Sequence, residues 1–355
     1  MNKKFVLPKI ILSSSPDPDG DLPDLSVVLF DYINHKYTIE SIESLVKQDF
    51  PKKKFEVIVL TDDSAPYCIE FLKNSKLRCT VIYTGLVPIG QSFSVAMQFV
   101  QGQIICPLDN DDLFEPNRLS IIDNLFKENR NLVFLKNEVK PFSRYYSGKS
   151  LAILYFLKMN IPLRCKGGNY LLTNKTPRWV YGRAILHNSS SMAVRRVVLE
   201  TNRKSVEELI AFPDSFIFFA SALSGGDCLF MDLPLTLYSV EKGSSTRRDH
   251  KGSESNKSRS ELALLHHLRF FFDGIERAEN TNILDLFQLF KTSTKILIFL
   301  SGAEDVIISN QEIWIMLRTS IRFRSHNFII LVAFYLLARI KMIRNIMRVV
   351  YDALI

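Results

Sequence analysis

The chain has 355 residues, of which 47% are hydrophobic and 23% are charged. These proportions are typical of a folded globular protein, and they exclude both a disordered chain and a small disulfide scaffold. Lysine and arginine number 45 against 37 acidic residues, which gives a formal net charge of +8. That charge suits a phosphate-bearing ligand and an anionic membrane face equally well.

The length exceeds what one hydrophobic core usually serves, so we expect one large domain with an appendage, or two domains. The five cysteines lie far apart, without the short spacing of a zinc site or a redox motif. The N-terminal apolar run is interrupted at Pro8 and Lys9, before it reaches signal-peptide length. The longest apolar run near the end, at 328–338, is shorter than the roughly 18 residues of a spanning helix. These features predict a cytoplasmic protein.

Short β-rich runs alternate with helical patterns from Leu25 onward. Residues 1–24, which include a Pro-, Asp- and Gly-rich segment, are interpreted as an N-terminal extension. Strands are predicted at 25–30, 55–60, 80–83 and 103–108, and helices at 39–48, 68–74, 92–101 and 118–128. This alternation predicts a mainly parallel sheet, because parallel neighbours need a crossover and a helix supplies it.

The C-terminal third differs in composition. Residues 247–260 are rich in Ser, Gly and charge, which predicts a mobile loop. Residues 261–355 have helical patterns and no proline.

Acidic residues follow three of the predicted strands at the point where each strand ends. Asp31 follows the first strand, Asp62 the second, and the run Asp109-Asn110-Asp111-Asp112 the fourth. Ligands of open α/β sheets bind at the carboxyl ends of the strands, so we expect these side chains to converge. Asp109 and Asp111, two positions apart, can reach one Mg²⁺ or Mn²⁺ ion. The alternative is that the run caps the following helix.

Four segments occur together in a characteristic order, namely SVVLFDYIN, SLVKQDF, FEVIVLTDDS and QGQIICPLDNDDLFEPNRL. In this order and spacing they resemble the family 2 inverting glycosyltransferases of the GT-A fold, from Leu25 to about Thr246. The resemblance implies an α/β, Rossmann-like, mainly parallel sheet flanked by helices, with a C-terminal helical appendage. It divides the domain at 25–246 into a nucleotide-binding half, 25–115, and an acceptor half, 116–246.

The resemblance implies transfer of a sugar from a nucleotide-diphosphate sugar to a hydroxyl of a glycan or lipid-linked acceptor, assisted by Mg²⁺ or Mn²⁺. Tyr32 and Asp62 would hold the base, and the alternative for Asp62 is a turn residue. Asp109 would face the ribose and sugar, and Asp111 would be the principal metal ligand. Asp112 is interpreted as a helix-capping or supporting carboxylate.

The resemblance also implies roles in the acceptor half. Asp214, in FPDSF, takes the position of the general base, although Pro213 stands where a second acid is usual. The alternative is a plain N-terminal helix cap. Glu241 stands where a histidine often completes metal binding, and a solvated loop residue is the alternative. We assign no ligand role to the histidines.

Two further departures from the family pattern concern Phe30, which replaces a proline, and Phe93, which stands where an arginine commonly approaches the diphosphate. Charge compensation would then fall to the metal, or to Arg247 and Arg248. These departures leave a second possibility open, a catalytically silent relative that binds nucleotide sugars or acts as a scaffold at the membrane. A sugar nucleotidyltransferase would need a Gly-rich basic loop after the first strand, which FDYINHKY lacks. We expect no nucleic-acid partner.

The tail from Trp314 to Ile355 mixes basic and apolar residues. Lys341, Arg344 and Arg348 share one face of a predicted helix, and Ile, Met and Val side chains line another. This pattern predicts peripheral attachment to anionic lipids on the cytoplasmic membrane face. The alternative is that these helices pack on the catalytic domain.

Overall fold

The computed structural model describes most of the chain, which forms two compact units. Unit 1 comprises residues 1–158, 167–171 and 187–245, and unit 2 comprises 159–166, 172–186 and 246–355. The described residues are 8–14, 20–32, 35–85, 87–150, 169–173, 176, 188–210, 213–240, 265, 268–271, 273–279, 281–301, 306–323, 329, 331–333 and 335–336.

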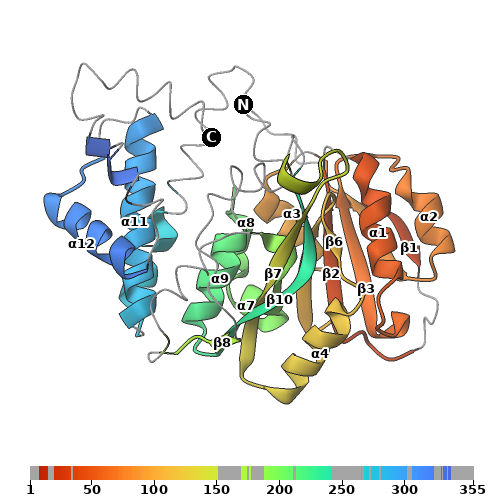
Figure 1. The fold of residues 1–355 in the computed structure, drawn as a ribbon. Coiled ribbons are helices and arrows are strands. Elements are labelled where there is room, and N and C mark those ends of the chain that lie inside the picture. The colour runs from red at the N-terminus through yellow and green to blue at the C-terminus, as the bar shows by residue number, and fades with distance from the viewer. Residues whose placement is uncertain are drawn as a thin grey trace. The chain divides into compact units, whose positions relative to one another are not determined.

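Unit 1 is built on one ten-stranded sheet with helices on both faces (Figure 1). The strands are β1 (Lys9–Ser14), β2 (Leu25–Asp31), β3 (Phe55–Thr61), β4 (Arg78–Tyr83), β5 (Ile104–Asp109), β6 (Leu113–Phe114), β7 (Leu132–Phe142), β8 (Tyr170–Leu171), β9 (Met192–Arg195) and β10 (Asp227–Ser239). Their order is β1-β4-β3-β2-β5-β9-β7-β10-β6, with β8 paired to β10. Strands β4, β3, β2 and β5 are parallel neighbours, which confirms the predicted arrangement.

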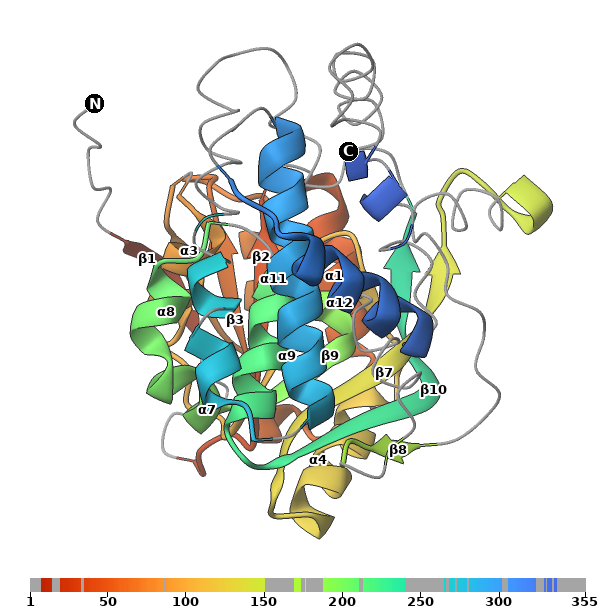
Figure 2. The same cartoon turned by 90° about the vertical axis from the view of Figure 1, so that its left-hand side faces the viewer.

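The helices of unit 1 form two layers. They are α1 (Thr38–Val46), α2 (Cys68–Asn74), α3 (Ile89–Ala96), α4 (Arg118–Glu128), α7 (Arg196–Thr201), α8 (Arg203–Glu207) and α9 (Pro213–Leu223). Side chains from α1, α2 and α4 share one hydrophobic cluster with the sheet. Figure 2 shows α3, α7, α8 and α9 on the opposite face. Helices therefore cover both faces of the central strands, which explains why those strands are almost continuously apolar.

Alternate residues of β2 point to the two layers. Leu25, Val27 and Leu29 belong to the cluster shared with α1, α2 and α4. Phe30 points the other way, and its ring lies 5.6 Å from that of Phe93 on α3. The two phenylalanines that depart from the family pattern thus pack against each other, so one apolar contact accounts for both departures.

The segment SLVKQDF joins α1 to α4 through Gln48. The Gln48 side-chain amide donates a hydrogen bond of 2.9 Å to the carbonyl of Glu115. Its oxygen accepts one of 3.0 Å from the N–H of Leu119, in the first turn of α4. A helix leaves its first N–H groups without partners inside the helix, so Gln48 serves here as a cap supplied by another element.

Residues 9–14, which we predicted to lie in an N-terminal extension, form strand β1. This strand pairs antiparallel with β4, with Lys9 opposite Tyr83 and Ser14 opposite Cys79. This strand was not predicted from the sequence. The β-branched and apolar residues of KIILSS allow it to join the sheet edge, where its outward side stays exposed.

Unit 2 contains α11 (Thr281–Ser301) and α12 (Asn310–Arg322). Ser309 and Glu312 form a capping box at the start of α12. The Glu312 carboxylate also lies 2.7 Å from Lys295 Nζ and 3.3 Å from Lys291 Nζ, both on α11. No described helix is long and apolar enough to cross a membrane.

Burial alone would raise the pKa of Glu312, but the hydrogen bond from Lys295, the backbone of Ser309 and the lysine charges lower it to about 2. A carboxyl with a lowered pKa stabilises the folded state above its ordinary pKa of 4.5, and the stabilisation is lost as pH falls toward 2.

We expect Glu312→Gln to weaken α12 by about 1 kcal/mol at pH 7, measured by amide hydrogen exchange. The difference from wild type should shrink as the pH falls below about 4. Glu43→Gln, which removes an exposed pair with Lys47, is the control and should change little. Equal exchange in the Glu312 variant and wild type at pH 7 would show that this pair does not stabilise the helix.

Candidate active site

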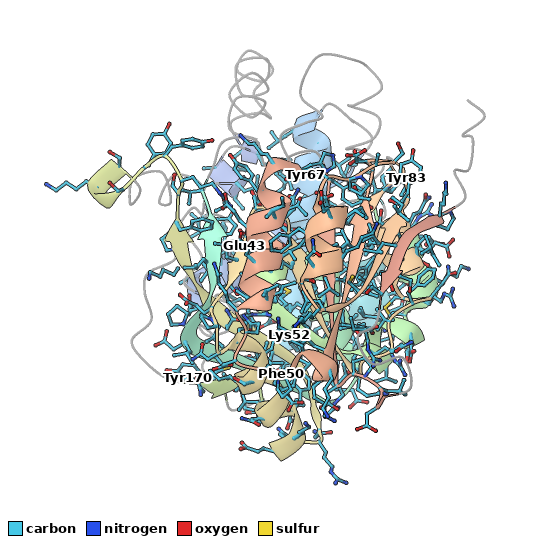
Figure 3. The ribbon with its side chains drawn as sticks, turned by 90° about the vertical axis from the view of Figure 1, so that its right-hand side faces the viewer. Glu43, Phe50, Lys52, Tyr67, Tyr83 and Tyr170 are labelled. Atoms are coloured by element: carbon cyan, nitrogen blue, oxygen red, sulfur yellow. The ribbon has the colours of Figure 1, made fainter. Side chains whose placement is uncertain are left out.

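The carboxyl ends of β3, β2 and β5 lie side by side at one edge of the sheet, the active edge. In Figure 3, Tyr67 and Tyr83 mark this edge, and Phe50 and Lys52 mark the opposite one. Tyr83 is the last residue of β4, and Lys52 precedes the first residue of β3. The edge near Tyr83 therefore holds the carboxyl ends of these parallel strands, and the edge near Lys52 holds their amino ends. The acidic residues that end or follow β2, β3 and β5 lie at this edge near Tyr83.

Asp31 joins the ends of three strands. Its side chain is 1% exposed. One carboxylate oxygen accepts hydrogen bonds from the Thr38 hydroxyl on α1 and, at 3.2 Å, from the Asn110 amide that follows β5. The other accepts one of 3.1 Å from Thr61 Oγ1 at the end of β3. Burial of a carboxylate without such donors would be costly, so this network confirms that the three strand ends converge.

The acidic turn, residues 109–112, is held in place by α1. Ser41 Oγ on that helix donates to the carbonyls of Asn110 and Asp112, at 2.7 and 2.8 Å. Asp109 is fixed on the other side, since Ser189 Oγ donates to its carboxylate at 3.1 Å. The backbone of the turn therefore has little freedom, although the Asp109 and Asp111 side chains are only partly buried.

Asp112 does not cap α4, which begins further along the chain. It is 1% exposed and accepts hydrogen bonds from the N–H of Ser239, at 2.8 Å, and from the Asn188 amide, at 3.1 Å. The capping interpretation was therefore wrong, because the side chain turns inward and ties the end of β10 to the acidic turn. Burial raises the pKa of Asp112, and the charges of Asp111 and Asp109 raise it further.

The acidic turn is the part of the site that fits a divalent cation. The described residues contain no group of three or more His, Cys, Asp or Glu side chains that could hold a metal by themselves. Mg²⁺ and Mn²⁺ ions bound to phosphates usually take one or two carboxylates and complete their shell with phosphate oxygens and water. Asp109 and Asp111 can supply that number, and the concentrated negative charge that raises the pKa of Asp112 favours a cation there. Glu241 lies outside the described residues.

Tyr32 and Asp62 lie at the same edge. The Tyr32 hydroxyl donates to Ser92 Oγ at 2.7 Å and lies 2.8 Å from Thr84 Oγ1, which fixes the ring between the end of β4 and α3. Burial raises the pKa of Tyr32 to about 12, so the phenol is neutral at physiological pH. The buried Oδ1 atom of Asp62 receives no well-directed hydrogen bond in the described structure. That atom faces His35 Nε2 at 3.3 Å.

Sequence reasoning missed two residues of this site. His35 lies between two carboxylates, with Nδ1 2.9 Å from Asp31 and Nε2 3.3 Å from Asp62. Its place four residues after Asp31 was a weak signal. Arg144 follows β7, pairs with Glu40 at 2.7 Å, and donates to the Asp111 carbonyl at 3.3 and 3.4 Å. No sequence pattern marked it, yet it brings a positive charge to the acidic turn.

Asp214 lies in the first turn of α9, and its carboxylate accepts a 2.8 Å hydrogen bond from the N–H of Ser215. The chain just before α9 is anchored near the active edge, because Leu209 accepts a 3.1 Å hydrogen bond from the N–H of Gly90 at the start of α3. A Cβ at Gly90 would lie 2.1 Å from the Val206 carbonyl, so only glycine permits this approach. His187, Arg247 and Arg248 lie outside the described residues.

Comparison with known proteins identifies a domain match. The family described as "Glycosyl transferase family 2" matches residues 26–199, just under half of the chain. The matched range contains β2 through β9 and the complete acidic turn, so the match includes the active edge described above.

A curated relative and two solved structures resemble this chain. Poly(ribitol-phosphate) beta-N-acetylglucosaminyltransferase TarS of Staphylococcus aureus is 29% identical over 114 residues, which are 31% of this chain and only 20% of that protein. The crystal structure of residues 1–349 of S. aureus TarS has a TM-score of 0.56 at 17% identity, covering 84% of this chain and 80% of that one. Its complex with UDP-GlcNAc has a TM-score of 0.53 at 18% identity, covering 84% and 88%. These similarities confirm the predicted GT-A-type fold.

Ser41→Ala should loosen the acidic turn, because it removes the hydroxyl donor from two buried carbonyls. The expected loss of stability is about 1–3 kcal/mol in urea unfolding. Ser120→Ala removes a more exposed hydroxyl, bonded to Asp49 on the surface, and should cost clearly less. If both variants unfold at the same urea concentration as wild type, α1 does not hold the turn through Ser41.

Proposed function

We propose that the protein is a metal-dependent, inverting glycosyltransferase that moves a sugar from a nucleotide-diphosphate sugar to a hydroxyl of a glycan or lipid-linked acceptor. The observation that carries the proposal is the convergence of Asp62, Asp109 and Asp111 at one sheet edge, tied together through Asp31. The relative TarS is named for N-acetylglucosamine transfer to poly(ribitol-phosphate), and its structure was solved with UDP-GlcNAc. That supports a nucleotide-sugar donor here.

The donor would lie along the active edge from Tyr32 to the acidic turn. Asp62 accepts a hydrogen bond from a ring N–H of the base, and Tyr32 lies beside it. Asp109 faces the ribose and sugar, and Asp111 with Asp109 holds Mg²⁺ or Mn²⁺. The bound ion would neutralise the charge that develops on the diphosphate leaving group. Arg144 adds a second positive charge next to Asp111.

Asp214 would act as general base on the acceptor side. It removes the proton from the acceptor hydroxyl as that oxygen attacks the anomeric carbon from the face opposite the nucleotide, which inverts the configuration. Leu209, four residues before α9, accepts a hydrogen bond from Gly90 at the start of α3, which supports a place for α9 on the same face of the sheet as α3. A plain helix cap remains the competing role, since Asp214 accepts from Ser215.

A catalytically silent nucleotide-sugar-binding protein is the second candidate. Two observations favour it: Pro213 stands in place of an acid, and Phe93 is buried against Phe30 where an arginine is usual. Both candidates predict donor binding, and only the first predicts transfer. The two variants below separate them.

Asp111→Ala should abolish metal-dependent donor binding and transfer while leaving the fold intact, because this partly buried carboxylate at a sheet edge carries little packing. Binding would be measured by calorimetry with Mn²⁺ and with EDTA. Asp21→Ala, an exposed aspartate, is the matched control and should bind like wild type. Turnover of the Asp111 variant near the wild-type rate would remove Asp111 from the metal site.

Asp214→Asn should leave nucleotide-sugar affinity nearly unchanged and lower the transfer rate about a hundredfold or more, the usual scale for a general base. The amide keeps the size and the hydrogen-bonding oxygen of the side chain, so a helix cap would survive the change. Nucleotide release in the presence of acceptor gives the rate. Full transfer by the variant would place the base elsewhere.

We further propose that the protein works in the cytoplasm, attached to anionic lipids through its C-terminal region. Among the described residues of α12, Trp314 and Ile321 are 68% and 67% exposed, and they lie two turns apart. Arg318 is exposed between them. An apolar pair flanking a basic residue suits the surface of an anionic bilayer. Most of the predicted basic tail beyond this helix lies outside the described residues.

Replacing Trp314 and Ile321 together with Gln should reduce sedimentation with phosphatidylserine-containing liposomes severalfold at low salt, because both side chains lose their affinity for the bilayer interface. Leu22→Gln is the control, since Leu22 is 67% exposed but lies in unit 1. Equal sedimentation of wild type and both variants, or none for wild type, would refute membrane attachment through α12.

A further inference from the structure

His35 occupies an unusual position for a histidine, between the carboxylates that follow two adjacent strands. Its ring belongs to the short helix η1 (His35–Tyr37), which connects β2 to α1. Nδ1 lies 2.9 Å from Asp31 Oδ1, and Nε2 lies 3.3 Å from Asp62 Oδ1. The ring is 25% exposed, so it is neither in bulk solvent nor in the core.

The contacts of Asp31 determine how the ring must be protonated. Thr38, Asn110 and Thr61 donate hydrogen bonds to the Asp31 oxygens, so this side chain acts as an acceptor and His35 Nδ1 is the donor. In neutral imidazole only one nitrogen carries a hydrogen, whereas both do in the imidazolium. With Nδ1 donating, neutral His35 presents a lone pair to Asp62, and charged His35 presents an N–H.

The state of His35 therefore decides what happens at Asp62. The imidazolium attracts the Asp62 carboxylate and holds it in one orientation. The neutral ring turns a lone pair toward Asp62 Oδ1, which is buried and receives no well-directed hydrogen bond in the described part of the chain. That contact is repulsive, so the carboxylate loses its fixed orientation when His35 loses its proton.

We propose that His35 is a positioning residue for nucleobase recognition, and that its protonation fixes Asp62 in the orientation that accepts the ring N–H of the donor base. This inference deepens the proposed function and depends on its nucleotide-sugar site. The chemistry suits a uracil or guanine base, since both carry a ring N–H that a carboxylate can accept.

The test is calorimetric binding of UDP-N-acetylglucosamine, and of GDP-mannose as a second probe, to the full chain with Mn²⁺ at pH 7. Wild type should bind at least one of the two probes. Asp62→Asn should bind that probe about tenfold more weakly, because the carboxylate that accepts the ring N–H is lost.

His35→Phe removes the donor to Asp62 and should weaken binding about tenfold. His35→Gln supplies an amide that can donate to Asp62, so it should keep most of the wild-type affinity. Wild-type affinity in His35→Phe, or equal weakening in both His35 variants, would overturn the role of His35 while leaving the nucleotide site intact. Failure of wild type to bind either probe would instead count against the proposed donor site, and the role of His35 would fall with it.

Discussion

The buried carboxylate of Asp31 is the interaction on which the arrangement of the site depends. Hydrogen bonds to a charged group contribute about 1.5–3 kcal/mol each, and a buried carboxylate without them would be strongly destabilising. Asp31 satisfies its oxygens from α1, from the end of β3 and from the turn after β5. Because each donor comes from a different element, folding of unit 1 brings the three strand ends to one place.

Negative charge gathers around that point and must be balanced. Asp62, Asp109, Asp111 and Asp112 follow the same strands, and burial with the neighbouring acids raises the pKa of Asp112. Arg144 brings a positive charge to the acidic turn, where it pairs with Glu40 and stacks 4.0 Å over the Tyr37 ring. A divalent ion with a diphosphate would complete this balance, which is why we interpret the charge as a binding feature rather than a stabilising one.

Much of this fold could be predicted from the sequence, because strands of the central sheet read as apolar runs separated by helical patterns. The predicted helix at 118–128 has the observed bounds of α4, and the predicted strand at 25–30 ends one residue before β2 does. Strand β1 was missed because it pairs antiparallel at the sheet edge, outside the alternation of parallel strands and helices. The strand order in the second half of the sheet could not be predicted, because β9 lies between β5 and β7 although it follows both of them in the sequence.

The site was predictable where a strand end fixes the position of a side chain, and not where tertiary contacts do. Asp62 and the acidic turn follow their strands directly, so pattern and topology sufficed. Asp112 looked like a helix cap because sequence alone does not show that Ser239, far along the chain, reaches it. His35 and Arg144 were missed for the same reason, since their partners lie on other elements.

The central claim is that the active edge of unit 1 binds a nucleotide-diphosphate sugar with a metal ion. The most direct measurement is calorimetric titration of the full chain with UDP-, GDP-, CDP-, ADP- and dTDP-sugars in Mn²⁺ and again in EDTA. The account predicts that at least one binds with a dissociation constant of about 1 μM to 1 mM and that EDTA weakens it. If none binds with Mn²⁺ or Mg²⁺, or if binding is equally strong in EDTA, the account of the metal-assisted donor site is contradicted.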